Sequence, residues 1–181
     1  MLRHRQNRDK ASGGDIVESE NRETSMTKPV GFDPKSLPES NSTSYPEPWR
    51  TQAAKRWNRR VGDHGGLKNF GVNLTRIEPG GVSSQRHWHL KQDEFVYVLE
   101  GEAVMITDAG EKLMKPGMCA CFPAGAKNGH HFLNRTSKDV LLLVVGDRTP
   151  GDSGEYPDID MTVALQPDGS FRFFRKDGTP Y

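Results

Sequence analysis

Cysteine and long apolar runs are both scarce in this sequence, and each scarcity narrows what the protein can be. The 181 residues include only two cysteines, Cys119 and Cys121, which lie two apart and would share one face of a strand. Because that geometry is poor for a disulfide between them, we interpret both as small core residues of a protein in a reducing compartment, which predicts a cytoplasmic location. The longest apolar run, Val140 to Val145, is far shorter than the roughly 18 residues of a membrane span.

The sequence also lacks an excess of charge of either sign. Its formal net charge is +1, so the bulk electrostatics predict neither a nucleic acid partner nor attachment to an acidic membrane surface. The N-terminus is basic, but no apolar stretch follows it, and this excludes a typical secretory signal. No Ser-His-Asp set and no phosphate-cradling glycine loop is evident either, so chemistry by those routes is not predicted.

Residues 1–44 are rich in charge and poor in apolar side chains. The nine apolar residues of this stretch are scattered without a period among fourteen charged ones. Such a segment cannot bury enough apolar surface to offset its ordering entropy, so we predict a disordered arm that is dispensable for folding. Met26 lies inside it and is an alternative to Met1 as the first residue of the protein.

Residues 45–65 form a basic segment ahead of the main domain. Trp49, Ala53 and Trp57 recur every four residues, which predicts a short helix docked on the core. The five basic side chains of this segment favour a solvated helix face over a site for an anionic substrate. They are Arg50, Lys55, Arg56, Arg59 and Arg60.

Residues 66–147 read as a series of short strands separated by glycine-containing turns. Residues 70–77 alternate apolar and polar side chains, residues 94–107 form two strands around Gly101, and residues 108–111 turn the chain again. Strands recurring every 8–12 residues predict an all-β sandwich or barrel of one domain. Residues 148–181 read as a loop followed by an aromatic strand, and we expect this C-terminal extension to pack on the outside of the barrel.

Two histidines one residue apart are the most informative feature of the sequence. His87 and His89 would project from the same side of a strand, together with Gln85, and Glu94 opens the returning strand. Imidazole combined with carboxylate suits one divalent ion of Zn, Mn, Fe, Ni or Co. A polar strand edge with no metal is the competing interpretation of the His-x-His pattern, and the pattern by itself does not decide between them.

The spacing around these residues resembles the two signature motifs of the cupin superfamily. The first comprises Gly81, His87, His89, Glu94 and Gly101, and the second comprises Gly117, Pro123, Gly125, His130 and Asn134. The resemblance implies a double-stranded β-helix, or jelly-roll barrel, over residues 66–147. It also implies that His87, His89, Glu94 and His130 hold one divalent metal. The chain departs from the motif in having four residues rather than two between Gly125 and its histidine, which leaves His131 as an alternative to the preferred His130.

Alternation along the strand predicts which side chains next to the candidate ligands share their face. Gln85 shares the ligand face and is a candidate for binding a metal-bound substrate, with a structural hydrogen bond to backbone as the alternative. Arg86 and Trp88 alternate with the ligands, so we expect them to face away from the metal, with the guanidinium on the indole.

The resemblance implies a metal-dependent enzyme acting on a small, polar, oxygen-rich molecule. The whole chain looks similar to bacterial cupins labelled as sugar-phosphate isomerases, in which the metal would polarise a carbonyl. With iron, dioxygenase chemistry is the other option. A non-catalytic binding or sensing module with a structural metal is the alternative class. Residues 94–100 are apolar on both faces, which predicts a homodimer, with a covering terminal segment as the alternative.

Overall fold

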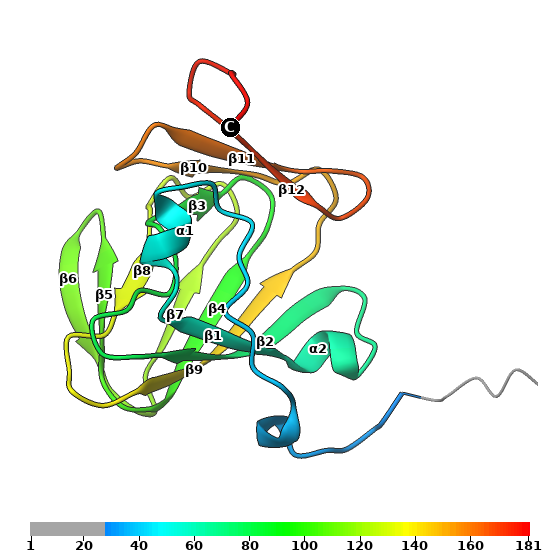
Figure 1. Cartoon of the computed structure of the whole chain (residues 1–181), viewed down its shortest axis with the longest axis vertical. Helices are drawn as coiled ribbons and strands as arrows, with labels where there is room; N and C mark the ends of the chain where they lie inside the picture. The colour runs from blue at the N-terminus through cyan, green and yellow to red at the C-terminus, as the bar shows by residue number, and fades with distance from the viewer. Residues whose placement is uncertain (1–27) are drawn as a thin grey trace, which may run out of the picture.

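The computed structural model describes residues 28–181, which fold mainly into antiparallel strands with three short helices (Figure 1). The predicted arm over residues 1–27, including the alternative start at Met26, lies outside the described residues. The helices are η1 (Pro34–Ser36), α1 (Trp49–Gln52) and α2 (Val61–His64). Among the described residues, no helix has the length and apolar character needed to cross a membrane.

The first layer is a five-stranded sheet in the order β1-β2-β9-β4-β7. Its strands are β1 (Arg56–Arg60), β2 (Phe70–Ile77), β4 (Glu94–Glu100), β7 (Cys119–Phe122) and β9 (Val140–Asp147). All neighbours are antiparallel, and the central pair joins residues 70–77 to residues 140–147 without a break in register. The predicted strands at 70–77 and 94–100 are confirmed.

The second layer consists of two smaller sheets that continue into one another. One has the order β6-β5-β8 and the other β12-β11-β10-β3. The isolated bridges Val82–Leu133 and His87–His130 connect them. Their strands are β3 (Trp88–His89), β5 (Ala103–Thr107), β6 (Gly110–Met114), β8 (His131–Leu133), β10 (Ser153–Tyr156), β11 (Met161–Leu165) and β12 (Phe171–Phe174). The two-layered antiparallel arrangement is the predicted jelly roll, and the hydrogen bonds leave it as separate sheets rather than one closed barrel.

The main core lies between the two layers. The first layer contributes Val98 and Leu142, and the second contributes Met114 and Phe132, all at most 2% exposed. Alternation along each strand places these side chains inward while their neighbours face outward. The tight turn from β4 to β5 needs a glycine, because Gly101 has a φ of +75° and a Cβ there would lie 2.5 Å from the Asp139 carbonyl oxygen.

The helix predicted from Trp49, Ala53 and Trp57 is only partly present. It ends at Gln52, and residues 56–60 form strand β1 instead, paired along its whole length with β2. Tertiary pairing therefore overrides the four-residue spacing. The solvated helix face predicted for the basic residues is wrong for Arg59, because its guanidinium bonds to Glu39 at 2.8 Å on the outer face of the sheet.

The part of the predicted arm that the structure describes, residues 28–44, contacts the body of the protein. Ser40 exchanges backbone hydrogen bonds with Asn58 of β1, and Lys35 pairs with Glu100. Glu39 accepts hydrogen bonds from Arg76 at 2.9–3.3 Å. The prediction of a disordered arm up to residue 44 therefore differs from the structure here, because long-range ion pairs compensate for the lack of apolar residues.

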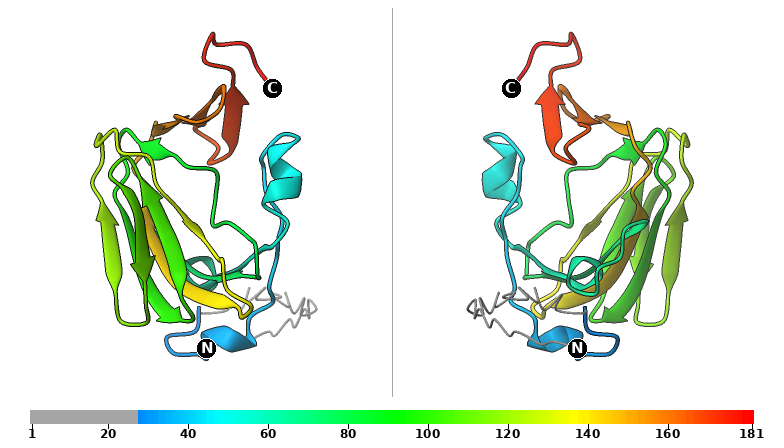
Figure 2. Two further views of the ribbon diagram at one scale, coloured as in Figure 1. Left: turned by 90° about the vertical axis from the view of Figure 1, so that its left-hand side faces the viewer. Right: turned by 90° about the vertical axis from the view of Figure 1, so that its right-hand side faces the viewer.

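The C-terminal extension contains more strand than the sequence indicated. Residues expected to be a loop form β10 and β11, and β10 pairs with β3. These strands cover one end of the molecule, opposite to η1 (Figure 2). Beneath them lies a second apolar cluster, built around Tyr45, Ala53, Tyr156, Met161 and Val163.

The interpretation of the cysteines as core residues is wrong. Cys119 and Cys121 are free and exposed, on the outer face of the edge strand β7. They do share one face, as the spacing predicted, but that face is opposite to the core. Their inward neighbours Ala120 and Phe122 pack against the main core instead.

Candidate metal centre

His87 and His130 are brought together by direct backbone pairing. The His87 amide donates to the His130 carbonyl at 3.2 Å, and the His130 amide donates to the His87 carbonyl at 2.9 Å. Residues directly opposite one another in an antiparallel pair project from the same face, and the two ring centroids are 5.0 Å apart. Two histidines that are 43 residues apart in sequence therefore line one side of the interior.

His89 occupies the short strand β3, opposite Gly154 of β10. The absence of a side chain at Gly154 allows this pairing to be close, because a Cβ there would lie 2.9 Å from the Trp88 carbonyl oxygen. The imidazoles of His87 and His89 meet edge to face with their centroids 5.0 Å apart. The short stretch from His87 to His89 thus presents both rings to one point.

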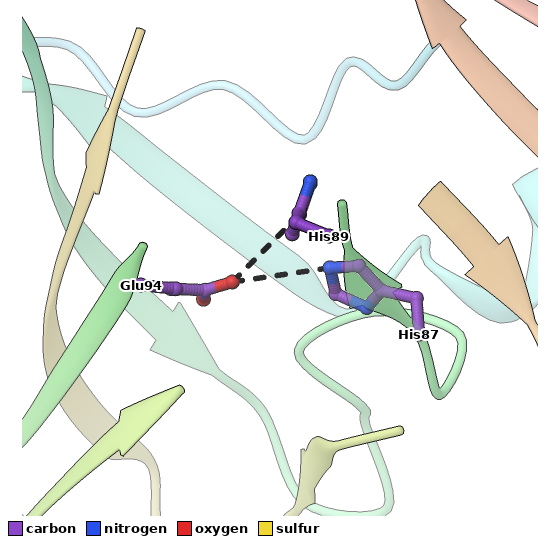
Figure 3. Close-up of side chains that lie close together, drawn as sticks. All are labelled: His87, His89 and Glu94. Carbon is purple, nitrogen blue, oxygen red and sulfur yellow. Dashed lines mark ion pairs between the residues drawn. The ribbon is translucent and has the colours of Figure 1, made fainter. Parts of the chain in front are cut away.

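Glu94 reaches this point from the opposite layer. It is the first residue of β4, and its side chain lies on the inner face of the sheet, the same face as the buried Val96 two residues later. Its carboxylate points at the imidazoles (Figure 3). Glu94 Oε2 lies 3.9 Å, 4.0 Å and 3.2 Å from the Nε2 atoms of His87, His89 and His130. All three imidazoles therefore present the same ring nitrogen to one carboxylate oxygen.

The other ring nitrogens have different surroundings. His87 Nδ1 lies 2.9 Å from the Gln85 carbonyl oxygen, and His89 Nδ1 lies 2.6 Å from Asp152 Oδ2. His130 Nδ1 is buried without a hydrogen-bond partner among the described residues. At His87 and His89, the acceptor beside Nδ1 places the proton of the neutral imidazole on that atom and leaves the lone pair of Nε2 directed at Glu94.

The electrostatics keep two of the donor groups, His87 and Glu94, in forms that bind cations. Burial lowers the pKa of His87 to about 3, so its ring is neutral near pH 7. Burial alone would raise the pKa of Glu94, but the hydrogen bond with His130 and the surrounding imidazoles lower it to about 2. For His89, as for His87, burial acts to lower the pKa. The hydrogen bond to Asp152 and the negative charge of Glu94 outweigh it, so the pKa of His89 is raised.

These residues fit a divalent transition metal. One ligand atom from each of His87, His89 and Glu94 lies within 4.8 Å of the others. Three imidazoles and one carboxylate are the donor types that suit Zn, Mn, Fe, Ni and Co, and such a set leaves open positions on an ion that prefers five or six ligands. His130 is not part of this group of three, but its Nε2 approaches Glu94 Oε2 at 3.2 Å.

The neighbouring histidine is directed elsewhere. His131 begins β8, and its Nδ1 lies 3.1 Å from the Ser84 carbonyl oxygen. Because adjacent residues in extended chain face opposite sides, only one of the two can reach Glu94. The structure places His130 beside Glu94 and directs His131 away, and the preference for His130 as a ligand stays a prediction. The His130 ring also stacks on Phe122, with centroids 3.4 Å apart.

The observed contacts of Gln85 and Arg86 differ from those expected. The Gln85 side chain donates to Gln52 at 3.0 Å and does not line the cavity beside Glu94. Arg86 is bonded to Asp108 and Asp158 rather than to an indole. Trp88 borders the cavity, with Lys127 Nζ 5.7 Å from its ring centroid. The expected stacking of Arg86 on an indole is therefore wrong, and strand alternation does not apply to Gln85 and Arg86 because regular strand covers only Trp88 and His89.

A small cavity of about 60 Å³ opens beside Glu94. It is lined by His89 and His130 of the candidate centre and by Trp88 and Gln92, among others. Three further lining residues, Pro123, Ala126 and Asn128, belong to the loop between β7 and β8.

Asp152 is the site residue that sequence reasoning missed. It is 2% exposed and lies in a stretch expected to be loop, and its partner His89 is 63 positions away. No local pattern marks such a contact, although the strand-like residues 161–165 that follow could have revealed that the extension is paired.

Comparisons with known proteins agree with this geometry. A family model described as a cupin domain matches residues 73–146. A crystal structure of a cupin-superfamily sugar phosphate isomerase from Silicibacter pomeroyi is 48% identical and covers 83% of this chain and 96% of its own, with a TM-score of 0.80. A structure from Acidithiobacillus ferrooxidans is 28% identical over 70% of this chain and 80% of its own, with a TM-score of 0.63.

A polyketide cyclase from Streptomyces resistomycificus is 20% identical over 65% of this chain and 78% of its own, with a TM-score of 0.53. At that identity the likeness concerns the fold alone. A search among curated proteins gave no match.

Proposed function

Because the chain belongs to the cupin superfamily, we propose that it is a metal-dependent enzyme of this superfamily acting on a small, polar, oxygen-rich substrate. The observation that carries the proposal is the convergence of three Nε2 atoms on Glu94 Oε2, at 3.2–4.0 Å. We assign His87, His89, Glu94 and His130 as ligands of one divalent ion. Such an ion supplies Lewis acidity toward a substrate hydroxyl or carbonyl.

The residues of this chain would prepare the site before a substrate arrives. Glu94 is held as a carboxylate and His87 as a neutral imidazole, so neither has to lose a proton before binding a cation. Phe122 stacks on His130 and lines the cavity, which shields one ligand from water. A preformed and partly dry pocket strengthens electrostatic interactions with the substrate.

Sugar phosphate isomerisation is the reaction we favour. The Silicibacter pomeroyi protein that carries this name is 48% identical to the chain. Lys127 supports an anionic substrate, because it lies between Ala126 and Asn128, which line the cavity, and places its ammonium over the Trp88 ring. A positive charge beside the cavity suits a phosphate group, while the hydroxyl or carbonyl end would face the candidate ligands.

Elemental analysis of protein purified without added metal tests the site. We expect about one divalent ion per chain, and we expect His87→Ala and Glu94→Ala each to lose most of it, since each removes a direct ligand. His64→Ala is the matched control. His64 lies in α2 and packs on Phe32, so this variant should keep full metal occupancy. Full occupancy in both ligand variants would contradict the assignment.

Turnover assays then separate the reaction classes. Oxygen-independent isomerisation of a sugar phosphate with bound zinc or manganese supports the proposal. Bound iron with oxygen consumption points to a dioxygenase instead. Metal binding without turnover of any substrate, combined with ligand-induced thermal shifts, favours the alternative of a binding or sensing module.

We also propose a cytoplasmic homodimer. Both cysteines are free, in line with a reducing compartment. A groove of about 460 Å³ lies at the end of the five-stranded sheet where β2 and β4 begin; Phe70, Phe95 and Val145 of the outer face line it together with Glu94 and Phe122, and Phe70 is 51% exposed. Exposed apolar surface of this kind favours burial against a second copy. Phe95→Lys should yield monomers in sedimentation, and a wild-type monomer at micromolar concentration would overturn the proposal.

A further inference from the structure

The carboxylate of Asp152 is buried between the C-terminal extension and β3. Its side chain is 1% exposed. Oδ2 lies 2.6 Å from His89 Nδ1, and Oδ1 accepts a hydrogen bond from the Lys91 amide at 2.8 Å. The backbone is fixed as well, because the Leu165 amide donates to the Asp152 carbonyl at 2.9 Å. Both carboxylate oxygens are thus committed to the segment that carries His89.

This contact determines which nitrogen of His89 carries the proton. An ionised carboxylate only accepts hydrogen bonds, so the ring must present an N–H to it at Nδ1. In the neutral imidazole the lone pair then resides on Nε2, the atom 4.0 Å from Glu94 Oε2. The opposite tautomer would lose the contact with Asp152 and place a proton where a cation is expected.

His89 differs in this respect from the other two candidate ligands. His87 Nδ1 is held by a backbone carbonyl, and His130 Nδ1 has no partner among the described residues. A carboxylate behind an imidazole orients the ring and raises its basicity as a ligand more than a neutral acceptor does. Asp152 and Glu94 also supply two negative charges within the same interior, which match the charge of a divalent ion.

We infer that Asp152 is the positioning residue of the metal centre, and that the C-terminal extension completes the site by fixing the His89 tautomer. The inference rests on the proposed function, because it assumes that His89 Nε2 binds the ion. It assigns a role to a segment that lies beyond the matched cupin domain, which ends at residue 146.

Asp152→Asn provides the test. Asparagine has the same size, but its single oxygen can serve either the Lys91 amide or His89 Nδ1 and not both. With the oxygen on Lys91, the amide N–H faces Nδ1 and favours the tautomer protonated at Nε2. We expect ¹⁵N NMR of the metal-free protein at alkaline pH to show this proton shift for His89. We expect Zn²⁺ affinity, measured by chelator competition, to fall by about 10–100-fold.

Asp158→Asn is the matched control. Asp158 belongs to the same extension and pairs with Arg86, not with an imidazole of the centre. It should leave both the His89 tautomer and the Zn²⁺ affinity unchanged. Should Asp152→Asn fail to fold, Asp152→Ser replaces it, since serine keeps an oxygen for the Lys91 amide without a carboxylate for His89.

The outcomes distinguish this inference from the proposed function. A switched tautomer together with weakened Zn²⁺ binding supports a positioning role. An unchanged tautomer or an unchanged affinity in the Asp152 variant, with wild-type protein that binds Zn²⁺, overturns it and leaves the proposed function standing. Wild-type protein that binds no metal overturns the proposed function, and the inference falls with it.

Discussion

The two faces of the five-stranded sheet carry different chemistry although they are built from alternate residues of the same strands. On β4, the inner face holds Glu94 and the fully buried Val98, while the outer face holds Phe95 and the 38% exposed Leu99. The inner face is closed off by the second layer of the jelly roll. Residues 33–40 contact the outer face through Glu39, which pairs with Arg59 and Arg76, whereas Phe70 at the start of β2 is 51% exposed. The difference teaches that apolarity alone does not identify the interior of this protein.

The largest difference in the free energy of unfolding is expected between alanine variants of two adjacent leucines on β9. Leu142 is fully buried in the main core, whereas Leu143 is half-buried on the outer face beside Tyr97. Leu142→Ala leaves a cavity between the layers and should lower the free energy of unfolding by about 3 kcal/mol. In the monomer, Leu143→Ala should cost about 1 kcal/mol or less, because the side chain is partly solvated there.

Urea denaturation of the two variants at neutral pH checks this contrast. Equal destabilisation by the two leucine variants would show that the outer face is as tightly covered as the inner one. That result would be expected if a second copy of the chain buries Leu143, so the measurement should be repeated at several protein concentrations.

A second contrast concerns the adjacent histidines. His130→Ala removes a candidate ligand and should weaken Zn²⁺ binding by about 100-fold, at least as much as loss of an outer-shell partner. His131→Ala removes a ring that bonds to the Ser84 carbonyl and should leave the affinity within about threefold of wild type. Chelator competition measures both, and a stronger effect for His131→Ala would reverse the assignment.

The smallest effect is expected on the outer face, at Glu39. This carboxylate pairs with Arg76 and Arg59, and its side chain is 20% exposed. The hydrogen bond from Arg76 lowers the pKa of Glu39, so its contribution to stability is present above the ordinary value near 4.5 and is lost as pH falls below it.

Glu39→Gln should therefore destabilise the protein by about 1 kcal/mol at pH 7 and converge with wild type in acid. Thermal unfolding between pH 7 and pH 3 measures the difference. A gap between the two proteins that stays constant with pH would show that the charge of Glu39 is not what holds residues 33–40 to the sheet.

The sequence was sufficient to predict strands and the candidate site where the local residue pattern agrees with the fold. The strands at 70–77 and 94–100 follow from alternation and turns, and the motif spacing selected the residues that meet at Glu94. The pattern was misleading where tertiary contacts decide. Polar Thr75 faces the interior and bonds to Asn58, whereas the apolar Phe70 is exposed, so alternation located β2 without identifying its buried face.

Contacts between distant segments could not be predicted from the sequence. Arg56–Arg60 joins the sheet because β2 and Ser40 supply backbone partners, and nothing within the segment itself indicates this. The same holds for Asp152 and His89, whose contact depends on β10 pairing with β3. Each is a long-range hydrogen bond that has no periodic signature.

The register that joins β2 to β9 has a consequence for how the protein forms. Each residue from 70 to 77 pairs with one from 140 to 147, so the centre of the sheet closes a loop of about 60 residues at its narrowest. Such closure must be paid for in entropy before its contacts stabilise the chain, which predicts folding in milliseconds to seconds rather than microseconds. During synthesis, Glu94 cannot acquire its neighbours on β9 until residue 146 has left the ribosome.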